Sequence, residues 1–243
     1  MHIPNKFKQD DQEQLDAFIQ QYPFATLITY RGVNDADVNG SGVNDKVASD
    51  SGLEAHHIPF MLTQSQLSES KGKAVLQGHI VKVNPLWKNV KDKSEVLVVF
   101  SGPNHYISPN HYPTKQETGK AVPTWNYSVV HVTGRMSYIH DKAWNLDMIN
   151  RLTDQHEAGE PSPWSVADAP ENYIQKMLAA IVGIEIGILS MTGQWKLSQN
   201  QPEKNQLGLI SGLSQSTDVT SQEMADLIEK HADNIKNSEM GRR

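Results

Sequence analysis

The sequence predicts an α+β protein in which helices pack against an antiparallel β barrel or sandwich, followed by a helical extension. The first half of the chain holds short segments rich in β-branched and aromatic residues between turn signals, a pattern typical of antiparallel strands rather than βαβ units. The second half holds apolar residues at helical spacing behind helix-capping residues. With 243 residues and no cysteine, the chain can bury a core without disulfides.

Composition excludes several classes of function. The 22 Lys and Arg against 28 Asp and Glu give a net charge of −6, which disfavours a surface built to neutralise many phosphates. Only 37% of the residues are hydrophobic, and no apolar run approaches the roughly 18 residues that a membrane span needs. The first residues lack the pattern of a secretion signal. We therefore expect a cytoplasmic protein that does not enter a membrane.

The first half predicts one helix and a series of strands. Asp10 with Glu13 reads as a capping box, and Leu15, Phe18 and Ile19 lie behind it on one helical face. The strands are expected at Phe24–Tyr30, His57–Thr63, Lys73–Val81, Glu95–Ser101 and Val129–Ile139. Gly102, Pro103 and Asn104 read as a turn.

The second half predicts helices that begin at Asp141, at Asp168 with Glu171, near Pro202, and at Thr220 with Glu223. A last strand is expected over Ile184–Leu197. No internal repeat or linker divides the pattern, so we expect one domain over residues 1–200 and a helical extension over residues 201–243. Within the domain, residues 32–52 offer almost nothing to bury and predict a flexible loop.

No motif for a metal or a nucleotide is evident. His56 and His57 are adjacent, so on a strand their side chains point to opposite faces and cannot both bind one ion. Glycine-rich phosphate loops and a serine-hydrolase elbow are absent from the sequence. We expect no metal, and the residues alone identify no catalytic group.

Polar and aromatic residues gather at the ends of the predicted strands, for example Gly78-His79, Asn84 to Trp87, and Pro123 to Tyr127. Flat side chains with amide and imidazole donors suit a planar heteroaromatic ligand. They equally suit buried aromatics whose polar tips are paired, and the residues alone do not separate these two interpretations.

These segments, read in order, resemble one family. The opening Met1-His2-Ile3-Pro4 and the blocks listed next resemble the PaiB-type FMN-binding negative transcriptional regulators: Ala55 to Pro59, Gly78-His79, Asn84 to Trp87, Phe100 to Pro103 with Tyr106 to Ser108, Val122 to Tyr127 with Val130 to Val132, and Lys196 to Asn200. The resemblance runs from residue 1 to about residue 213. It implies that residues 1–200 form an FMN-binding split β-barrel similar to pyridoxamine-phosphate oxidase, in a homodimer with flavin sites at the interface.

The resemblance also implies a set of cofactor-binding residues. On the barrel strands and the turn after them these are His57, Pro59, Gly78, His79, Asn84, Trp87 and Lys88; nearer the interface they are Trp125, Asn126, Trp195 and Lys196. Oxidase relatives place arginine where this chain has His56 and His57. A neutral histidine holds phosphate less strongly than arginine does, so we expect FMN binding that is weak or sub-stoichiometric.

Three functions remain open. The family implies a regulatory protein acting on transcription; the fold also suits a flavin-dependent oxidoreductase, and a haem-binding split barrel is the lesser alternative. DNA is a partner by family label, but charge does not support it. The terminal helix carries Glu223, Asp226, Glu229 and Asp233 against Lys230 and Lys236, and we expect it not to read DNA.

Overall fold

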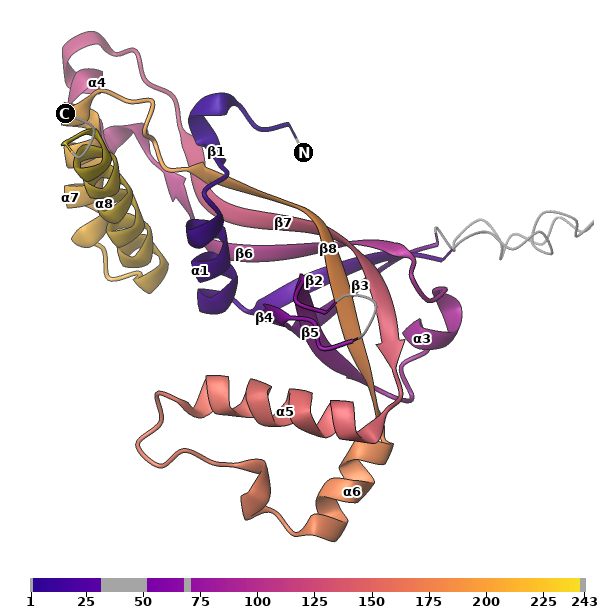
Figure 1. The fold of residues 1–243 in the computed structure, drawn as a ribbon. Helices are drawn as coiled ribbons and strands as arrows, with labels where there is room; N and C mark the ends of the chain where they lie inside the picture. Colours follow the sequence, from indigo (N-terminus) through magenta and orange to yellow (C-terminus); the bar gives the residue numbers. More distant parts are fainter. Residues whose placement is uncertain (1, 32–51, 68–70, 241–243) are drawn as a thin grey trace, which may run out of the picture. The chain divides into compact units, whose positions relative to one another are not determined.

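The computed structural model describes residues 2–31, 52–67 and 71–240, with side chains as far as residue 233 (Figure 1). All but Gly52 of the predicted loop 32–52 lies outside the described residues, as does the side chain of Lys236. Within the described ranges, no helix is both long enough and apolar enough to cross a membrane.

Strands and helices follow the predicted division of the chain into a strand-rich first half and a helix-rich second half. The strands are β1 Lys8–Gln9, β2 Phe24–Tyr30, β3 Leu53–Pro59, β4 Met61–Gln64, β5 Ala74–Val81, β6 Glu95–Ile107, β7 Thr124–Ile139 and β8 Ile181–Lys196. The helices are α1 Gln12–Gln21, α3 Leu86–Asn89, α4 Pro113–Thr118, α5 Lys142–Glu157, α6 Glu171–Ala179, α7 Glu203–Ser214 and α8 Val219–Met240, with short 3-10 turns η1 Asn5–Phe7, η2 Pro109–His111 and η3 Val166–Asp168.

The strands form one curled sheet in the order β3-β2-β6-β7-β8-β5-β4, and β1 pairs with β8 (Figure 1). Pairings of β2 with β3 and β6, and of β5 with β4 and β8, are all antiparallel. The predicted α+β class with an antiparallel barrel-like sheet, peripheral helices and C-terminal helices is confirmed.

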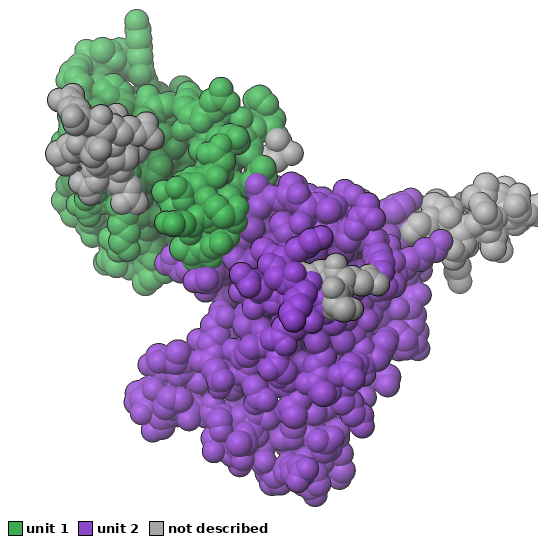
Figure 2. Space-filling view, viewed as in Figure 1, with its two compact units in different colours: residues 1–18, 101–130, 192–243 green, residues 19–100, 131–191 purple. Residues whose placement is uncertain are grey.

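The chain forms two compact units, shown in green and purple in Figure 2. Unit 1 holds residues 1–18, 101–130 and 192–243, and unit 2 holds residues 19–100 and 131–191. The division falls within α1, β6, β7 and β8. The expected division at residue 200 follows a different criterion, the sequence pattern, and it stays a prediction.

Unit 2 is built on alternating strand residues and one covering helix. In β2 the buried positions are Ala25, Leu27 and Thr29, every second residue, as a sheet with one face on the core requires. Met61 of β4 packs with Met148 and Leu152 of α5, so α5 covers this part of the sheet.

Unit 1 holds the C-terminal helices. Leu209 and Leu213 of α7 are buried, as are Met224 and Ile228 of α8, and the two helices pack on one another. A Cβ on Gly212 would collide with the His111 ring of η2, so glycine allows α7 to lie close to this turn.

Two local predictions in the first half are corrected. Helix α1 is capped by Asp11 rather than Asp10, because Asp11 Oδ1 accepts from the Gln14 N–H at 3.0 Å, while Asp10 pairs with Lys8 at 2.8 Å. The strand expected over His57–Thr63 is two strands. It breaks at Phe60, whose ring is fully buried and whose N–H donates to the Pro23 carbonyl.

Two caps in the second half also differ from the prediction. Asp168 serves the preceding turn η3, where its carboxylate accepts from the Ser165 N–H at 2.8 Å, and Pro170 precedes α6 instead. Helix α8 is capped by Asp218, whose Oδ1 accepts from the Thr220 N–H at 3.0 Å. The cap predicted at Asp141 is confirmed by its 2.7 Å bond from the Trp144 N–H.

Candidate functional site

A cavity of about 280 Å³ lies in unit 2, where β3 and β5 come together beside the turn that leads to α3. Its walls are His56, His57, Ile58, Pro59, His79, Ile80, Val81 and Asn84. Four predicted cofactor-binding residues, His57, Pro59, His79 and Asn84, therefore meet at one site. The volume is at the low end of the roughly 300–1,000 Å³ typical of ligand pockets.

Gly78 explains how β3 comes so close to β5. A Cβ at Gly78 would lie 2.9 Å from the Pro59 carbonyl oxygen, closer than real Cβ contacts, and 3.1 Å from the Phe60 ring, tighter than most of them. The pairing of β5 with β4 covers residues 74–77 only, so the Gly78–Val81 segment has β8 on one side and β3 across from it. Glycine at position 78 thus shapes the cavity wall through the backbone.

His57 is positioned by β2. Its Nδ1 lies 3.2 Å from Thr26 Oγ1, and its ring lies 6.1 Å from the Phe24 ring between centroids, tilted by 30°. The register that places Thr26 opposite His57 is part of the β2–β3 ladder. One imidazole nitrogen is therefore used within the protein, and Nε2 is the atom through which His57 can bind a ligand.

His79 and His56 each bring to the cavity a buried ring nitrogen that no described residue hydrogen-bonds, Nδ1 in His79 and Nε2 in His56. The His79 side chain is partly buried. Burial lowers the pKa of His79 below the ordinary value of 6.5, since a charged imidazole is disfavoured away from water. At neutral pH His79 is an uncharged ring with a nitrogen available to a ligand.

Asn84 connects the cavity to α3. Its Oδ1 accepts from the Leu86 N–H at 2.9 Å and so fixes the start of α3, which leaves the Nδ2 group as its ligand donor. Trp87 does not line the cavity: its Nε1 donates to the Lys82 carbonyl, and its ring meets His140 edge-on. The Lys88 ammonium lies 5.1 Å from the Trp87 ring centroid.

His56 lines the cavity although it was absent from the predicted set. Its Nε2 lies 3.4 Å from the Glu54 carboxylate. Strand alternation places His56 and His57 on opposite faces of β3. A cavity at the edge of a strand can nevertheless be lined from both faces, so both histidines line it. Sequence alone gives no signal for the approach of β5 that closes the cavity.

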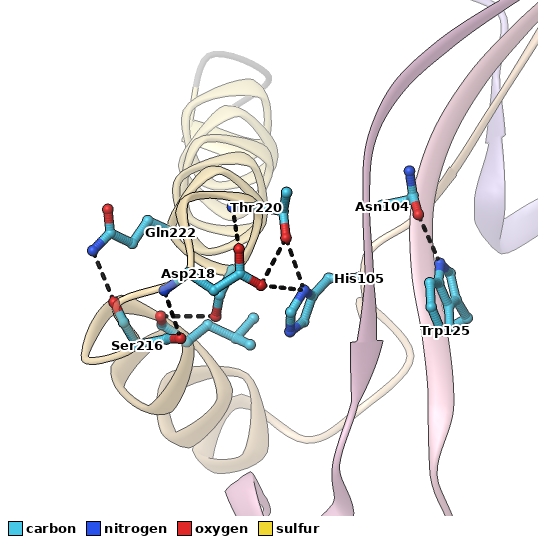
Figure 3. A network of polar contacts seen from close by, with 9 residues as sticks. Asn104, His105, Trp125, Ser216, Asp218, Thr220 and Gln222 are labelled. Atoms are coloured by element: carbon cyan, nitrogen blue, oxygen red, sulfur yellow. Dashed lines mark hydrogen bonds and ion pairs between the residues drawn. The ribbon is translucent and has the colours of Figure 1, made fainter.

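The remaining predicted residues lie in unit 1 and do not line this cavity. Trp125 is half exposed, donates to Asn104 Oδ1 at 3.2 Å and meets Tyr106 edge-on (Figure 3). Asn126 is fully buried and bonds Ser198.

Trp195 and Lys196 are also held by contacts within unit 1. The Trp195 ring is buried against Phe18 with centroids 5.2 Å apart, and Lys196 Nζ donates to Thr124 Oγ1 at 2.8 Å. Of the two predicted tryptophans in this unit, Trp125 has the more exposed ring.

Comparison with known proteins identifies the family. The family model described as "Putative FMN-binding domain" matches residues 1–190. The chain belongs to this family, and the resemblance found in the sequence is confirmed.

Curated relatives extend the match. The chain is 26% identical over 229 residues to the Protease synthase and sporulation protein PAI 2 of Bacillus subtilis, covering 94% of this chain and 97% of that protein. An uncharacterised protein of Emericella nidulans is 35% identical over 187 residues, covering 66% of this chain and 74% of that protein.

Solved structures confirm the fold. A FAD and heme binding protein from Mycobacterium smegmatis matches with a TM-score of 0.51 at 14% identity, covering 84% of this chain and 80% of that one. A conserved hypothetical protein from Mycobacterium tuberculosis matches with a TM-score of 0.52 at 9% identity, covering 84% and 95%. The fold is the split barrel that was predicted.

The cavity fits the polar groups of a flavin. It offers the Nδ1 of His79, which no described residue bonds, the amide of Asn84 and the Nε2 of His57, beside the apolar side chains of Ile58 and Ile80. None of the residues that line it is a lysine or an arginine. A phosphate would therefore be met here by neutral donors, which are weaker than a guanidinium. Family and residues together support a flavin cofactor.

Proposed function

We propose that this chain is a homodimeric regulatory protein that binds FMN in the cavity between β3 and β5. The observation that carries the proposal is the convergence of His57, Pro59, His79 and Asn84 on one cavity in a member of an FMN-binding family. When bound, the flavin supplies a redox-active ring whose occupancy or oxidation state can be sensed.

The residues of the cavity have distinct proposed roles. The unpartnered Nδ1 of His79 and the Nδ2 group of Asn84 bind the polar groups of FMN, and Gly78 keeps the wall close. Lys88, two residues into α3, adds positive charge near the turn, and Trp87 holds α3 through its bond to Lys82. Trp125, Asn126, Trp195 and Lys196 stay proposed as contacts with the flavin of a second copy.

A second copy is supported by apolar residues around the cavity. Phe24, whose ring contacts His57, is 65% exposed, Val81 is 55% exposed and Val83 is 91% exposed. Large apolar side chains that lie exposed beside a ligand site are typical of surfaces covered by a partner. We propose that the second subunit covers them and completes the site.

The regulatory role is supported by the relative that spans almost the whole chain. That relative is named for protease synthesis and sporulation, two processes that a cell regulates. We propose that flavin occupancy changes what the dimer binds, directly on DNA or through a protein partner. The net charge of −6 favours the protein partner.

A flavin-dependent oxidoreductase is the second candidate. His79 favours it, because a neutral imidazole with one unpartnered nitrogen can hold or release a proton beside a reacting ring. The named binding of FAD and heme by a protein of similar fold fits this candidate as well. If the chain with added FMN oxidised NADPH faster than free FMN does, the result would favour an oxidoreductase over a purely regulatory protein.

The test is a titration of the purified chain with FMN, followed by quenching of flavin fluorescence. We expect saturable binding that His79→Leu weakens by about tenfold or more, because a hydrogen bond to a charged or strongly polar group contributes ~1.5–3 kcal/mol. His156→Leu, on the exposed end of α5, is the matched control and should bind as the unchanged chain does.

Three results would contradict the proposal. Equal weakening by both histidine variants would mean a loss of folding rather than of a contact. No saturable FMN binding would remove the flavin site. A Soret band on adding haem, without FMN binding, would replace it with the haem alternative.

A further inference from the structure

A second cavity, of about 350 Å³, lies wholly within unit 1 and outside the residues matched by the family model. It is a partly open hollow lined by α7, α8 and the turn that follows β8. Its walls are Leu197, Gln199, Glu203, Gln206, Leu207, Ile210, Ile228, His231 and Ala232. None of these residues belongs to the flavin site described above.

The cavity follows one stripe on each helix. On α7 the lining residues stand at positions 203, 206, 207 and 210, and on α8 at 228, 231 and 232, the spacings that place side chains on one helical face. Leu207 is 59% exposed on this stripe, while Ile228 is buried at the floor. An apolar stripe that lines a hollow instead of filling it leaves room for a ligand with an apolar body.

The cavity offers several hydrogen-bond acceptors. Glu203 is the charged residue among those that line it, and Gln206 uses its Nε2 on the Gln201 carbonyl, which leaves Oε1 to accept. Gln199 is already bonded to backbone groups of Lys6, Trp195 and Leu197.

His231 completes the acceptor set. No hydrogen bond or ion pair joins it to the described residues, and burial lowers its pKa below 6.5, so its ring is neutral at pH 7 and has one acceptor nitrogen and one N–H donor. A carboxylate ligand would be repelled by Glu203, whereas an ammonium would be attracted to it and could donate to His231 and Gln206.

We propose that this cavity binds a small amphipathic amine, with its alkyl or aryl body against Leu207, Ile210 and Ile228 and its ammonium group toward Glu203, Gln206 and His231. The cavity volume lies within the roughly 300–1,000 Å³ typical of ligand pockets, so a small amine has room in it. The site gives the C-terminal helices a ligand of their own, separate from the flavin.

The test is calorimetric titration of the full chain with three probes that share the 2-phenylethyl group: 2-phenylethylamine, 2-phenylethanol and 3-phenylpropionate. The amine should bind saturably and at least about fivefold more tightly than the carboxylate, with the alcohol between them. Saturable binding of none of the three, or carboxylate affinity equal to or above that of the amine, would overturn the proposal.

Variants locate the site. Glu203→Gln should weaken amine binding by about two- to fivefold, the size expected for an exposed ion pair, and leave the affinity for the alcohol unchanged. Glu223→Gln is the matched control, an exposed carboxylate on α8 that does not line the cavity. Equal effects of the two variants on the amine would contradict the assignment of charge.

Ala232→Leu fills part of the cavity with a larger side chain, and leucine favours helix as alanine does. The variant should therefore lose binding of the amine while its melting temperature stays within a few degrees of that of the unchanged chain. Unchanged amine binding in a folded Ala232→Leu protein would place the ligand elsewhere and overturn the proposal. If this variant does not fold, the ratio measured for Glu203→Gln against Glu223→Gln decides.

Discussion

At the scale of single residues, burial keeps several histidine side chains neutral. Burial lowers the pKa of His79, His131 and His231 below 6.5. In the unfolded chain each binds a proton near its ordinary pKa, so between that value and the lower folded pKa the unfolded state holds more protons. The stability that these neutral histidines contribute is therefore fully present above about pH 6.5. It is lost as the pH falls from there toward the pKa values of the folded state.

This predicts a pH dependence assignable to His79. The free energy of unfolding in urea should be lower at pH 5 than at pH 7.5, and His79→Gln should reduce that difference, since glutamine does not titrate. His156→Gln, at an exposed position, should leave the difference unchanged. The same pH dependence in all three proteins would show that His79 does not contribute.

Gly78 offers a second test at this scale. Gly78→Ala places a methyl group 2.9 Å from the Pro59 carbonyl, so β3 must move away from β5. We expect a loss of about 1–3 kcal/mol in stability and weaker FMN binding. Gly159→Ala, where a Cβ meets nothing within 4 Å, is the matched control. Equal stability of both variants, measured by urea unfolding, would mean that the close approach is relaxed in solution.

At the scale of elements, strands with clean alternation were predictable and their extensions were not. β2 was predicted at its observed bounds because Phe24–Tyr30 is β-branched, aromatic and flanked by Pro23 and Arg31. β6 was expected to end at Ser101, since Gly102 and Pro103 read as a turn, yet it continues to Ile107. Gly102 is needed for close packing: its Cβ would collide with the Phe18 ring, a contact that local sequence does not reveal.

Caps were misplaced for a related reason. Asp10 and Asp11 are adjacent, Asp218 and Thr220 are two residues apart, and local propensity ranks the two candidates in each pair nearly equally. Further contacts of its carboxylate favour Asp218 as the cap of α8. Its Oδ2 accepts a hydrogen bond from Thr220 Oγ1 at 2.9 Å and lies 3.9 Å from His105 Nδ1 (Figure 3). His105 comes from β6, more than a hundred residues earlier, so this preference is tertiary.

The cap on α8 predicts a stability effect. Asp218→Ala should cost about 1 kcal/mol in the free energy of unfolding, because the Thr220 N–H loses its acceptor. Asp218→Asn keeps a capping oxygen and should recover most of that loss, since the exposed pair with His105 contributes little. If both variants lost the same stability, the ion pair rather than the cap would hold the helix start.

At the scale of the whole molecule, the candidate site was predictable in part. The residues on β3, β5 and the next turn meet in one cavity because they belong to strands that the fold brings together, and the family resemblance supplied that fold. Trp195 was assigned from the same resemblance, and its ring is buried against Phe18. A buried tryptophan and a ligand-facing one look alike in sequence, since both are large and apolar.

The proposed dimer gives a prediction at this scale. Light scattering behind size exclusion should report about twice 27.1 kDa at micromolar concentration. Val83→Asp, which places charge at a 91% exposed valine beside the cavity, should shift the mass toward the monomer. Val219→Asp, at an exposed valine where α8 begins, is the control and should stay dimeric. A monomeric unchanged chain would remove the dimer from the proposal.

The most direct test of the flavin site is the spectrum of ¹⁵N-histidine side chains during titration with FMN. The account predicts that His57 and His79, which line the cavity, shift or broaden in proportion to bound FMN, whereas the exposed His156 does not. It predicts the His79 shift to be among the largest, because its Nδ1 has no partner among the described residues. FMN binding that shifts His156 and leaves His57 and His79 unchanged would contradict the site between β3 and β5.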